Sequence, residues 1–597
     1  MKHTQTLITA LILTAVSALT AAGVAADQSK TNSPIPPLVT LKKSLKVTSR
    51  YLVFPMMFFE KVKSSVNVSI DGKPLFNNPG TLSTRGQFLW ANLDVSEFAG
   101  KEMTISAGVR EDEQEAMDAV HFSDTIEGHP DLYQEKLRSQ FHFSYRTGVM
   151  GDPTAMIYYP PKKEWHLFTI ANPFNGREIC WGHAVSKDLV HWEERAPIFH
   201  PPHLIFNGVG FIDTENCLKL NTNSQQAMVL LTPIMGRQDG NVSMKVSIDG
   251  GFVFKDMNDL RAELKREDLP KNPIVPGWAD APRIWQNPVA GKYFMTHCRW
   301  EHTGKEHPLT SLQYTSSDLK TWERVDNFPL LIHANFKGEG DANDVVEIPV
   351  DGDANKKVVF VNCGRNGYAL GKFSKTGLDN LQGEPLSPKD TLKDGHDGFP
   401  NIFANAPNGR VVAMGHPNNV GIVSTFAGFH TLSFPLELSV RTTPSGLRLF
   451  RNPVEEIATL QGQMHSYKDL TVNANTLTPL VEPKGDLFHI LIEAQVPIGV
   501  KLELQVDGKK LPVSPEKLFN GEAANPDQYP TLKAEFLVDR TCYEAFYQDG
   551  QFFASRGKIL DSQRKPGTPP VSLYAFGGAV KIISMTVYEL KSIWNQK

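Results

Sequence analysis

A motif that recurs about every 60–70 residues constrains the fold of this chain more than any other feature. Its copies are Ser186–Trp192 (SKDLVHW), Ser247–Phe254 (SIDGGFVF) and Ser316–Trp322 (SSDLKTW). Each copy follows a strand-like segment, places an Asp in a turn and ends in an aromatic residue for packing. This interval indicates propeller blades rather than helical solenoids. At that spacing, residues 135–455 are predicted to form about five blades.

Two further regions of alternating sequence flank the repeats. Residues 37–130 contain runs such as Val66–Ile70 and a turn at Asp71–Gly72, which predict a small N-terminal β domain. Residues 465–595 alternate apolar and polar side chains, as in Leu487–Ala494, which predicts an antiparallel sandwich. The expected fold is therefore all-β, a five-bladed β-propeller with a C-terminal β-sandwich and a small N-terminal β domain.

The N-terminus carries an export signal. Lys2 precedes an apolar run over residues 7–24, which ends in small residues. This order is typical of a signal peptide over residues 1–26, cleaved before Asp27. A membrane anchor is the alternative, but the run is rich in Ala and Thr and stops in a cleavage site. We therefore expect a secreted or periplasmic protein without a membrane partner.

Charge and cysteine content exclude several classes of function. The chain has 61 Lys and Arg against 65 Asp and Glu, a net charge of -4, so no basic excess points to nucleic acid. Its five cysteines show no metal-ligand spacing, and their odd number leaves at least one unpaired. No glycine loop for phosphate is present. We expect no metal, no cofactor and no nucleic-acid partner, and the oligomeric state is left open.

Acidic residues precede the first strand of successive predicted blades. Asp152 lies in Gly-Asp-Pro, just before the strand-like run Ala155–Tyr159. Asp280 precedes a second such run, and Asp341 and Asp344 precede a third. In a propeller, groups from different blades converge at the axis. Glycoside cleavage needs two carboxylates, one ionised and one protonated, that flank the scissile bond. The pattern therefore predicts a glycosidase site.

Seven segments of the chain, taken in order, carry a family resemblance. They are Phe141–Ser144, Gly151–Pro153, Trp165–Phe168, Asn172–Phe174, Trp181–Glu193, Phe434–Leu449 and Asp539–Phe546. In this order they resemble glycoside hydrolase family 32, the invertases and levanases, from about Leu132 to Tyr588. The preceding β domain looks like the extra N-terminal module of some bacterial members. The resemblance implies a propeller with a sandwich, and retaining hydrolysis of a fructan or related furanoside, an oligo- or polysaccharide.

The resemblance also implies roles for the carboxylates. Asp152 matches the nucleophile and Asp280 the residue that stabilises the transition state. Asp341 takes the acid/base position, where the family has Glu. Because Asp is one methylene shorter, this acid would retreat by about 1 Å, and such a misplacement can cost about a hundredfold in rate. Glu339 lies nearby and is an alternative acid.

Substrate contacts are predicted at four positions. Asn172 belongs to an Asn-Pro turn, and Asn207 lies in Phe-Asn-Gly, where the family has Phe-Ser-Gly. Trp278 is beside the second candidate Asp and is the better aromatic platform for a sugar. Trp181 fits two roles, substrate contact and the packing of a blade.

Several hydroxyl-binding groups of the family are replaced. Asn partners become Gly151 and Thr154, a Gln becomes Ile170 and an Arg becomes Ala279. Arg283, one turn of chain further on, could replace this Arg. Three interpretations follow: an active furanoside hydrolase, a carbohydrate-binding pseudoenzyme, and a furanosidase with another sugar specificity or an inverting mechanism. A carboxylate at all three catalytic positions favours activity.

Overall fold

A computed structural model describes most of the chain after the predicted signal peptide. The described residues are 36–57, 64–86, 88–135, 138–173, 180–199, 204–235, 241–276, 280–300, 309–325, 344–362, 367–385, 398–416, 431–513, 531–557 and 569–594. Strands dominate them, so the all-β prediction is confirmed. No helix in these segments is long and apolar enough to cross a membrane.

The first eight strands form one sheet. Apolar residues alternate along some of them, so that Val66, Val68 and Ile70 of β3 are buried on one face, whereas β2 is buried along almost its whole length. The order is β4-β3-β7-β5-β2-β6, with β1 on β7 and β8 on β2. The bounds are β1 (Leu38–Lys46), β2 (Tyr51–Met57), β3 (Ser65–Ile70), β4 (Lys73–Pro79), β5 (Thr81–Leu82), β6 (Leu89–Asp94), β7 (Glu102–Arg110) and β8 (His121–Ser123). A short helix, α2 (Glu115–Asp118), precedes β8.

Five blades of four antiparallel strands follow. Blade 1 is β9 (Val149–Tyr159), β10 (Glu164–Asn172), β11 (Cys180–Ser186) and β12 (Trp192–Phe199). Blade 2 is β14 (Val209–Ile212), β15 (Met228–Met235), β16 (Asn241–Ser247) and β17 (Lys255–Asp256), with β13 (Leu204–Ile205), β18 (Val275–Pro276) and helix α3 (Met257–Leu264). Blade 3 is β19 (Asp280–Asn287), β20 (Lys292–Trp300), β21 (Leu309–Ser316) and β22 (Glu323–Arg324). Blade 4 is β23 (Val345–Val350), β24 (Asp353–Asn362), β25 (Gly367–Ser374) and β26 (Gly377–Pro385). Blade 5 is β27 (Gly398–Ile402), β28 (Val412–His416), β29 (Leu436–Thr443) and β30 (Gly446–Pro453).

The recurrent motif forms the same turn in blades 1, 2 and 3. In blade 1, the carboxylate of Asp188 accepts hydrogen bonds from the Ser186 hydroxyl (3.1 Å) and from the backbone N–H of Val190 (3.0 Å) and His191 (2.8 Å). Asp249 and Asp318 accept equivalent bonds in blades 2 and 3. Each turn joins the third strand of its blade to the fourth, so a local Asp-centred turn accounts for the repeat.

The first strands of the blades form the inner ring of the propeller. Strand β9 contacts β14 and β27, β14 contacts β19, and β19 contacts β23. All five are first strands, and side chains near their starts contact one another, so these residues gather at one end of the ring.

Blades 5 and 1 close the ring along a seam without exchanging a strand, since every blade is built from consecutive strands. Ala404 donates to Met156 (2.8 Å) and accepts from Tyr158 (2.9 Å) across this seam. The chain just before β9 strengthens it, because the carbonyl of Phe143 accepts the backbone N–H of Leu432 at 3.0 Å.

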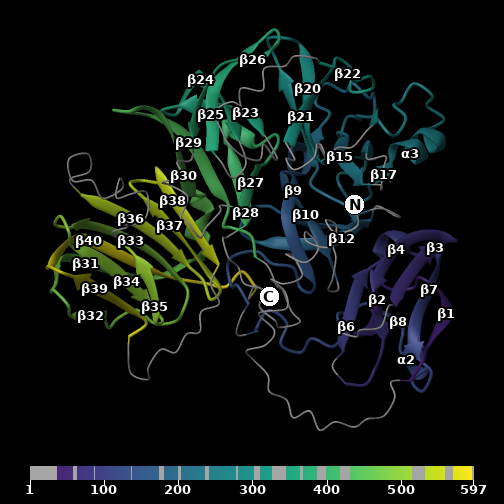
Figure 1. Ribbon diagram of the computed structural model, residues 1–597, viewed down its shortest axis with the longest axis horizontal. Helices are drawn as coiled ribbons and strands as arrows, with labels where there is room; N and C mark the ends of the chain where they lie inside the picture. The colour runs from purple at the N-terminus through teal and green to yellow at the C-terminus, as the bar shows by residue number, and fades with distance from the viewer. Residues whose placement is uncertain are drawn as a thin grey trace, which may run out of the picture.

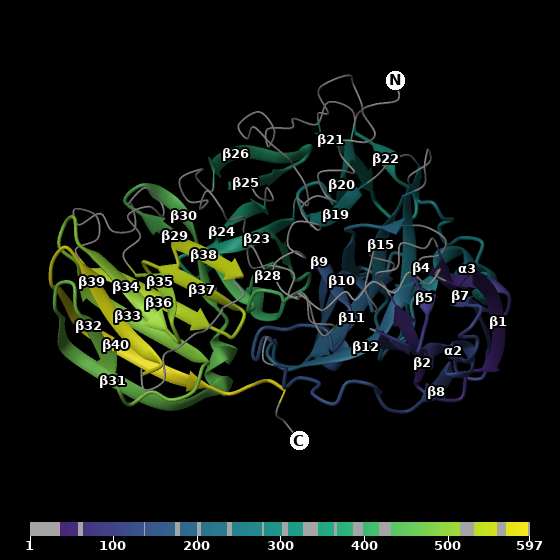
Figure 2. The same ribbon diagram turned by 60° about the horizontal axis from the view of Figure 1, so that its bottom comes forward.

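The C-terminal strands form a two-sheet sandwich with its own buried core. One sheet contains β31 (Gln461–Val472), β40 (Val580–Leu590), β33 (Phe488–Gln495), β36 (Leu532–Val538), β37 (Cys542–Tyr547) and β38 (Phe552–Gly557). The other contains β32 (Leu477–Leu480), β39 (Val571–Phe576), β34 (Lys501–Val506) and β35 (Lys509–Pro512). The sandwich and the N-terminal sheet lie on either side of the propeller (Figures 1 and 2).

Candidate active site

The first strands are irregular at the end of the ring where the candidate residues lie. The pairing of β9 with β10 shifts register twice, once between Met150 and Pro153, the stretch that holds Asp152, and once between Pro153 and Ala155. Strand β19 has a bulge between Asp280 and Arg283, and β27 has one just before Asn401. Bulges redirect side chains and are frequent beside active sites. Three of the five inner strands therefore turn side chains out of the regular pleat at the same end of the ring.

Asp152 lies in this irregular part of β9, beside Asn207 from the start of blade 2. The side-chain amide of Asn207 donates to Oδ2 of Asp152 at 3.3 Å. Asn207 is 7% exposed, and its carbonyl oxygen is buried without a hydrogen-bond partner among the described residues. A buried acceptor without a donor costs free energy, so this oxygen is ready for a donor beside the carboxylate.

The loop that carries Asn207 is held by Trp181 and by Thr154. Trp181 is fully buried, and its indole N–H donates to the carbonyl of Phe206 at 3.1 Å. A Cβ on Gly208 would lie 2.5 Å from the Trp181 ring, so only glycine fits above it. The backbone N–H of Gly208 donates to the hydroxyl of Thr154 in blade 1 at 2.5 Å. Trp181 thus supports the loop and does not reach solvent.

Arg283 connects the loop to three other blades. Its Nη1 donates to the carbonyl of Gly208, its Nη2 donates to Oδ1 of Asn401 at 2.8 Å, and its Nε lies 3.1 Å from Oδ1 of Asp344. Asn401 in turn donates to the carbonyl of Pro153, next to the candidate nucleophile. Arg283 is 1% exposed, so the guanidinium is committed to the protein and is not available to grip sugar hydroxyls as the sequence suggested.

Asp344 is the acidic partner within this network. Its Oδ2 accepts the backbone N–H of Ile402 in blade 5 at 3.0 Å. Burial raises the pKa of Asp344, while Arg283 and this hydrogen bond oppose the rise. Asp344 therefore ties blade 4 to blades 3 and 5. Sequence analysis noted Asp344 but missed Asn401, whose only signal is its place in the first strand of blade 5.

The other predicted residues fall in different places. Asp341, Glu339 and Trp278 lie outside the described residues, and of Asp280 the structure describes the backbone, as the first residue of β19. Asn172 is fully buried at the end of β10 and donates to Oδ1 of Asn78 in the N-terminal sheet at 2.8 Å. The structure thus brings Asp152, Asn207 and the support of Trp181 together, and places Asn172 at a domain interface.

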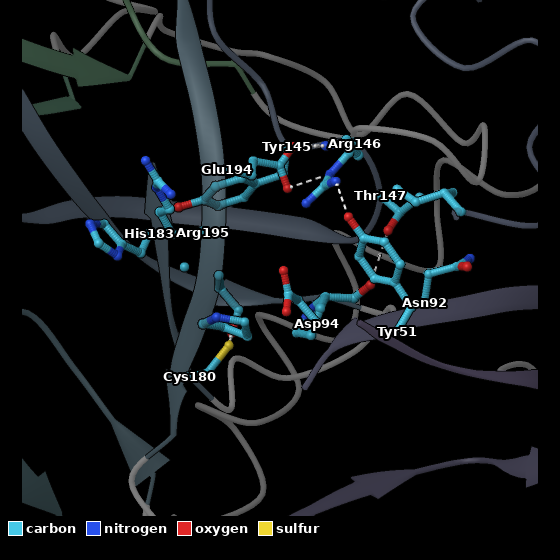
Figure 3. A pocket seen from close by; sticks show the side chains of 15 residues that line it. Tyr51, Asn92, Asp94, Tyr145, Arg146, Thr147, Cys180, His183, Glu194 and Arg195 are labelled. Atoms are coloured by element: carbon cyan, nitrogen blue, oxygen red, sulfur yellow. Dashed lines mark hydrogen bonds and ion pairs between the residues drawn. The ribbon is translucent and has the colours of Figure 1, made fainter. Parts of the chain in front are cut away.

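A small cleft lies between the N-terminal sheet and blade 1 (Figure 3). Arg146 crosses it, with Nη1 donating to the hydroxyl of Tyr51 at 2.7 Å and Nε 3.1 Å from the carboxylate of Glu194. Asp152 and Asn207 are not among its lining residues. The cleft is therefore separate from the ring of first strands.

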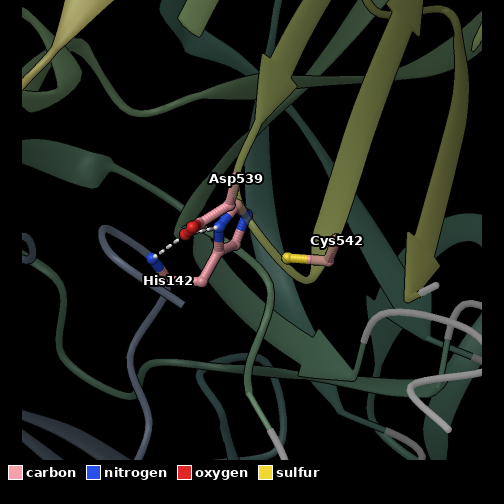
Figure 4. A group of neighbouring side chains, drawn as sticks. All are labelled: His142, Asp539 and Cys542. Carbon is pink, nitrogen blue, oxygen red and sulfur yellow. Dashed lines mark hydrogen bonds and ion pairs between the residues drawn. The ribbon is translucent and has the colours of Figure 1, made fainter. Parts of the chain in front are cut away.

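One set of possible metal ligands occurs among the described residues, His142, Asp539 and Cys542, whose ligating atoms lie within 4.8 Å of one another (Figure 4). The Asp539 carboxylate already accepts backbone N–H bonds from Gln140 (2.8 Å), Phe141 (3.0 Å) and His142, and one from Nδ1 of His142 at 2.9 Å. Its lone pairs are therefore occupied, and the donor set fits a hydrogen-bonded interface between propeller and sandwich rather than a metal centre.

A five-bladed propeller with a carboxylate at one end of its inner ring and a β-sandwich behind it is the architecture of a class of glycosidases. Residues 142–453 match the family model described as the glycosyl hydrolases family 32 N-terminal domain. This match covers more than half of the chain, which therefore belongs to glycoside hydrolase family 32, a family of fructofuranoside-hydrolysing enzymes. The predicted family and enzyme class are confirmed.

Relatives with described activities share most of the chain. A levanase from Bacillus subtilis is 26% identical over 517 residues, which are 77% of this chain and 72% of the levanase. An extracellular exo-inulinase from Aspergillus awamori is 21% identical over 536 residues, 78% of this chain and 96% of the inulinase. Among solved structures, the exo-inulinase from A. awamori superposes with a TM-score of 0.61 at 17% identity, over 77% of this chain and all of that one. The fructofuranosidase from Schwanniomyces occidentalis in complex with fructose gives 0.60 at 18%, over 78% of this chain and all of that one.

Proposed function

We propose that this family 32 enzyme is a secreted hydrolase of fructans or related furanosides that works by a retaining, two-carboxylate mechanism. Asp152 is the nucleophile, Asp280 stabilises the oxocarbenium-like transition state and Asp341 is the acid/base. The substrate class follows from the family and from relatives named levanase and exo-inulinase. Export follows from the signal-like residues 1–26 and from the extracellular inulinase among the relatives.

The observation that carries this proposal is the position of Asp152. It lies within the irregular stretch Met150–Pro153 at the start of the innermost strand of blade 1, and the Asn207 amide donates to its carboxylate. A hydrogen bond to the charged form favours an ionised carboxylate, which is the form that attacks the anomeric carbon. The arrangement suits a nucleophile, which must stay ionised while its partner acid is protonated.

The unpaired carbonyl of Asn207 supports a sugar ligand at this position. It is buried next to the amide that holds Asp152, and no residue in the described part of the chain donates to it. A sugar hydroxyl bound beside Asp152 would donate to it and remove the desolvation cost. One side chain would then hold both the nucleophile and the substrate, through its amide N–H and its carbonyl.

The test is hydrolysis of levan, inulin, sucrose and aryl furanosides by the mature protein and by Asp152→Ala. We expect fructose release to fall by about 1,000-fold or more in the variant, because the covalent route is lost. The first sugar released by the wild type should keep the anomeric configuration of the substrate, as NMR would show. Asp249→Asn, a turn residue of blade 2, is the matched control and should keep wild-type rates.

Three results would contradict parts of the proposal. Release of an inverted anomer would replace the retaining mechanism with a direct displacement by water. Turnover only on furanosides other than fructosides would assign another sugar. No turnover on any substrate, with glycan binding equal in the wild type and Asp152→Ala, would make the chain a binding protein.

A further inference from the structure

Five polar links at one end of the inner ring form a closed circuit through all five blades. Blade 1 is linked to blade 2 by Thr154 and Gly208, and blade 2 to blade 3 by Gly208 and Arg283. Blade 3 is linked to blade 4 by Arg283 and Asp344, and blade 4 to blade 5 by Asp344 and the backbone N–H of Ile402. A further contact joins Arg283 directly to Asn401 of blade 5. Blade 5 returns to blade 1 through Asn401 and the carbonyl of Pro153.

Arg283 is the centre of this circuit. Three of its nitrogen atoms face three different chain segments, and its side chain is 2% exposed. Only the planar guanidinium offers donors in such fixed, diverging directions, whereas a lysine ammonium is a single point charge on a flexible stem.

The circuit reaches the candidate nucleophile from both sides. On one side, Arg283 holds Gly208, the neighbour of the Asn207 whose amide contacts Asp152. On the other side, Arg283 holds Asn401, which binds the carbonyl of Pro153, the residue after Asp152. The bulged segment around Asp152 lacks regular ladder pairing, so these contacts replace the strand pairing that would otherwise fix it.

We infer that Arg283 is a positioning residue, which fixes the Asp152 carboxylate by holding Gly208 and Asn401 at once. The inference rests on the proposed role of Asp152 and adds a residue that touches neither sugar nor reacting atoms. The chain has Ala279 where the resemblance expects an arginine that binds sugar hydroxyls. Its nearby Arg283 is buried and instead holds the backbone of the loop at Gly208. The preorganisation of the nucleophile then depends on blade 3.

The test compares Arg283→Lys with Arg138→Lys. Arg138 is the matched control: its side chain is fully buried, and it donates to the carbonyls of Tyr145 (2.7 Å) and Arg146 (2.9 Å), outside the ring. We expect both variants to melt at a lower temperature than the wild type. Only Arg283→Lys should lower kcat, by about 10- to 100-fold with KM within about twofold, because a loosened nucleophile affects the transition state more than ground-state binding.

A milder variant and a readout without turnover complete the experiment. Asn401→Ala removes the links to Pro153 and to Nη2 of Arg283 but leaves Arg283 on Gly208, and it should lower kcat by about tenfold with KM kept. Hydrogen–deuterium exchange followed by mass spectrometry should show faster exchange of peptides over residues 150–156 and 206–212 in Arg283→Lys but not in Arg138→Lys. Equal kcat and equal exchange in both arginine variants would overturn the inference. If the wild type lacks turnover, the proposed function fails, and the exchange comparison alone decides whether Arg283 positions the Asp152 segment.

Discussion

The propeller contacts its two flanking domains through interfaces that differ in how far their charged groups are buried. On the sandwich side, His142, Asp539 and Glu544 are fully buried, with His142 2.9 Å from Asp539 and 3.7 Å from Glu544. On the N-terminal side, Arg146 and Glu194 are partly exposed around the cleft of Figure 3, with side-chain exposures of 17% and 15%. The interface with the sandwich is therefore closed to water, and we call it the closed interface. The interface with the N-terminal sheet has a cleft that leaves room for water, and we call it the open interface.

At the closed interface, the buried ionisable groups offset the cost of burial for one another. Burial would lower the pKa of His142, but Cys542, Asp539 and Glu544 outweigh burial and raise the pKa well above its ordinary value. Burial raises the pKa of Glu544. For Asp539, burial is outweighed by His142 and the backbone donors, which lower the pKa. The sandwich interface is thus carried by fully buried ionic groups, whereas the N-terminal sheet meets the propeller through a shared apolar cluster, with Phe76 stacked on Phe199, and through the partly exposed contacts of Arg146.

The largest effect is expected for Asp539→Ala. The substitution leaves His142 and the backbone N–H groups of Gln140 and Phe141 without their acceptor. We expect a loss of about 3–5 kcal/mol in the free energy of unfolding, because a buried charge pair loses one partner. Scanning calorimetry would measure this as a lower unfolding temperature. Asp549→Ala, which removes an exposed pair with Lys533, should cost only about 0–1 kcal/mol, and equal losses in both variants would contradict the comparison.

A smaller effect is expected for Arg146→Met at the open interface. The variant loses the hydrogen bond to Tyr51 and the ion pair with Glu194, but water in the cleft can solvate both partners. We expect a loss of about 1–2 kcal/mol, seen as faster proteolysis at the N-terminal sheet while the unfolding temperature of the propeller stays unchanged. A loss as large as that of Asp539→Ala would show that the two interfaces are equivalent.

Asn78→Ala sharpens the comparison at a single hydrogen bond. The substitution removes the acceptor of the Asn172 amide, and we expect a loss of about 1 kcal/mol with KM unchanged. Asn172→Ala should give the same loss of stability. A rise of KM in Asn172→Ala that Asn78→Ala does not share would assign Asn172 to the substrate instead of the interface.

The smallest effect concerns pH at the open interface. Burial raises the pKa of Glu97 from 4.5 to about 7, while Lys245 in blade 2 and Lys101 oppose the rise. Between these two pH values the folded state keeps a proton that the unfolded state releases, so stability falls as pH rises through this range. Thermal unfolding between pH 4.5 and 8 should show this slope in the wild type and a flatter one in Glu97→Gln. Parallel curves would contradict it, and Glu267→Gln, on an exposed side chain, is the control.

Local patterns predicted the fold well because the information they need is local. The Ser-x-Asp turns at Asp188 and Asp318 form from neighbours within a few residues, so their repetition revealed the blades directly. The alternation of β3 and of the sandwich strands likewise reflects which face of each strand is buried.

The site was only partly predictable, because its contacts join residues far apart in the chain. Asp152 was identified from its place before an inner strand, and Asn207 from a family motif. Arg283 donates to Gly208 and Asn401, and Asn172 donates to Asn78. These hydrogen bonds depend on how blades and domains pack, which no local pattern encodes. The cluster of His142 with Asp539 joins positions 397 residues apart, beyond any spacing rule.

The seam between blades 1 and 5 has a consequence for how the protein is made. The segment just before β9 is fastened to blade 5 at Leu432 and to the sandwich at Asp539, and Glu544 holds the backbone N–H of Phe434 at 3.1 Å. A chain that emerges from its N-terminus completes all five blades before it supplies these two acidic residues. The contacts of Ala404 with blade 1 can therefore form as soon as blade 5 is made, but Asp539 and Glu544 reinforce the seam only after the C-terminal end has been made.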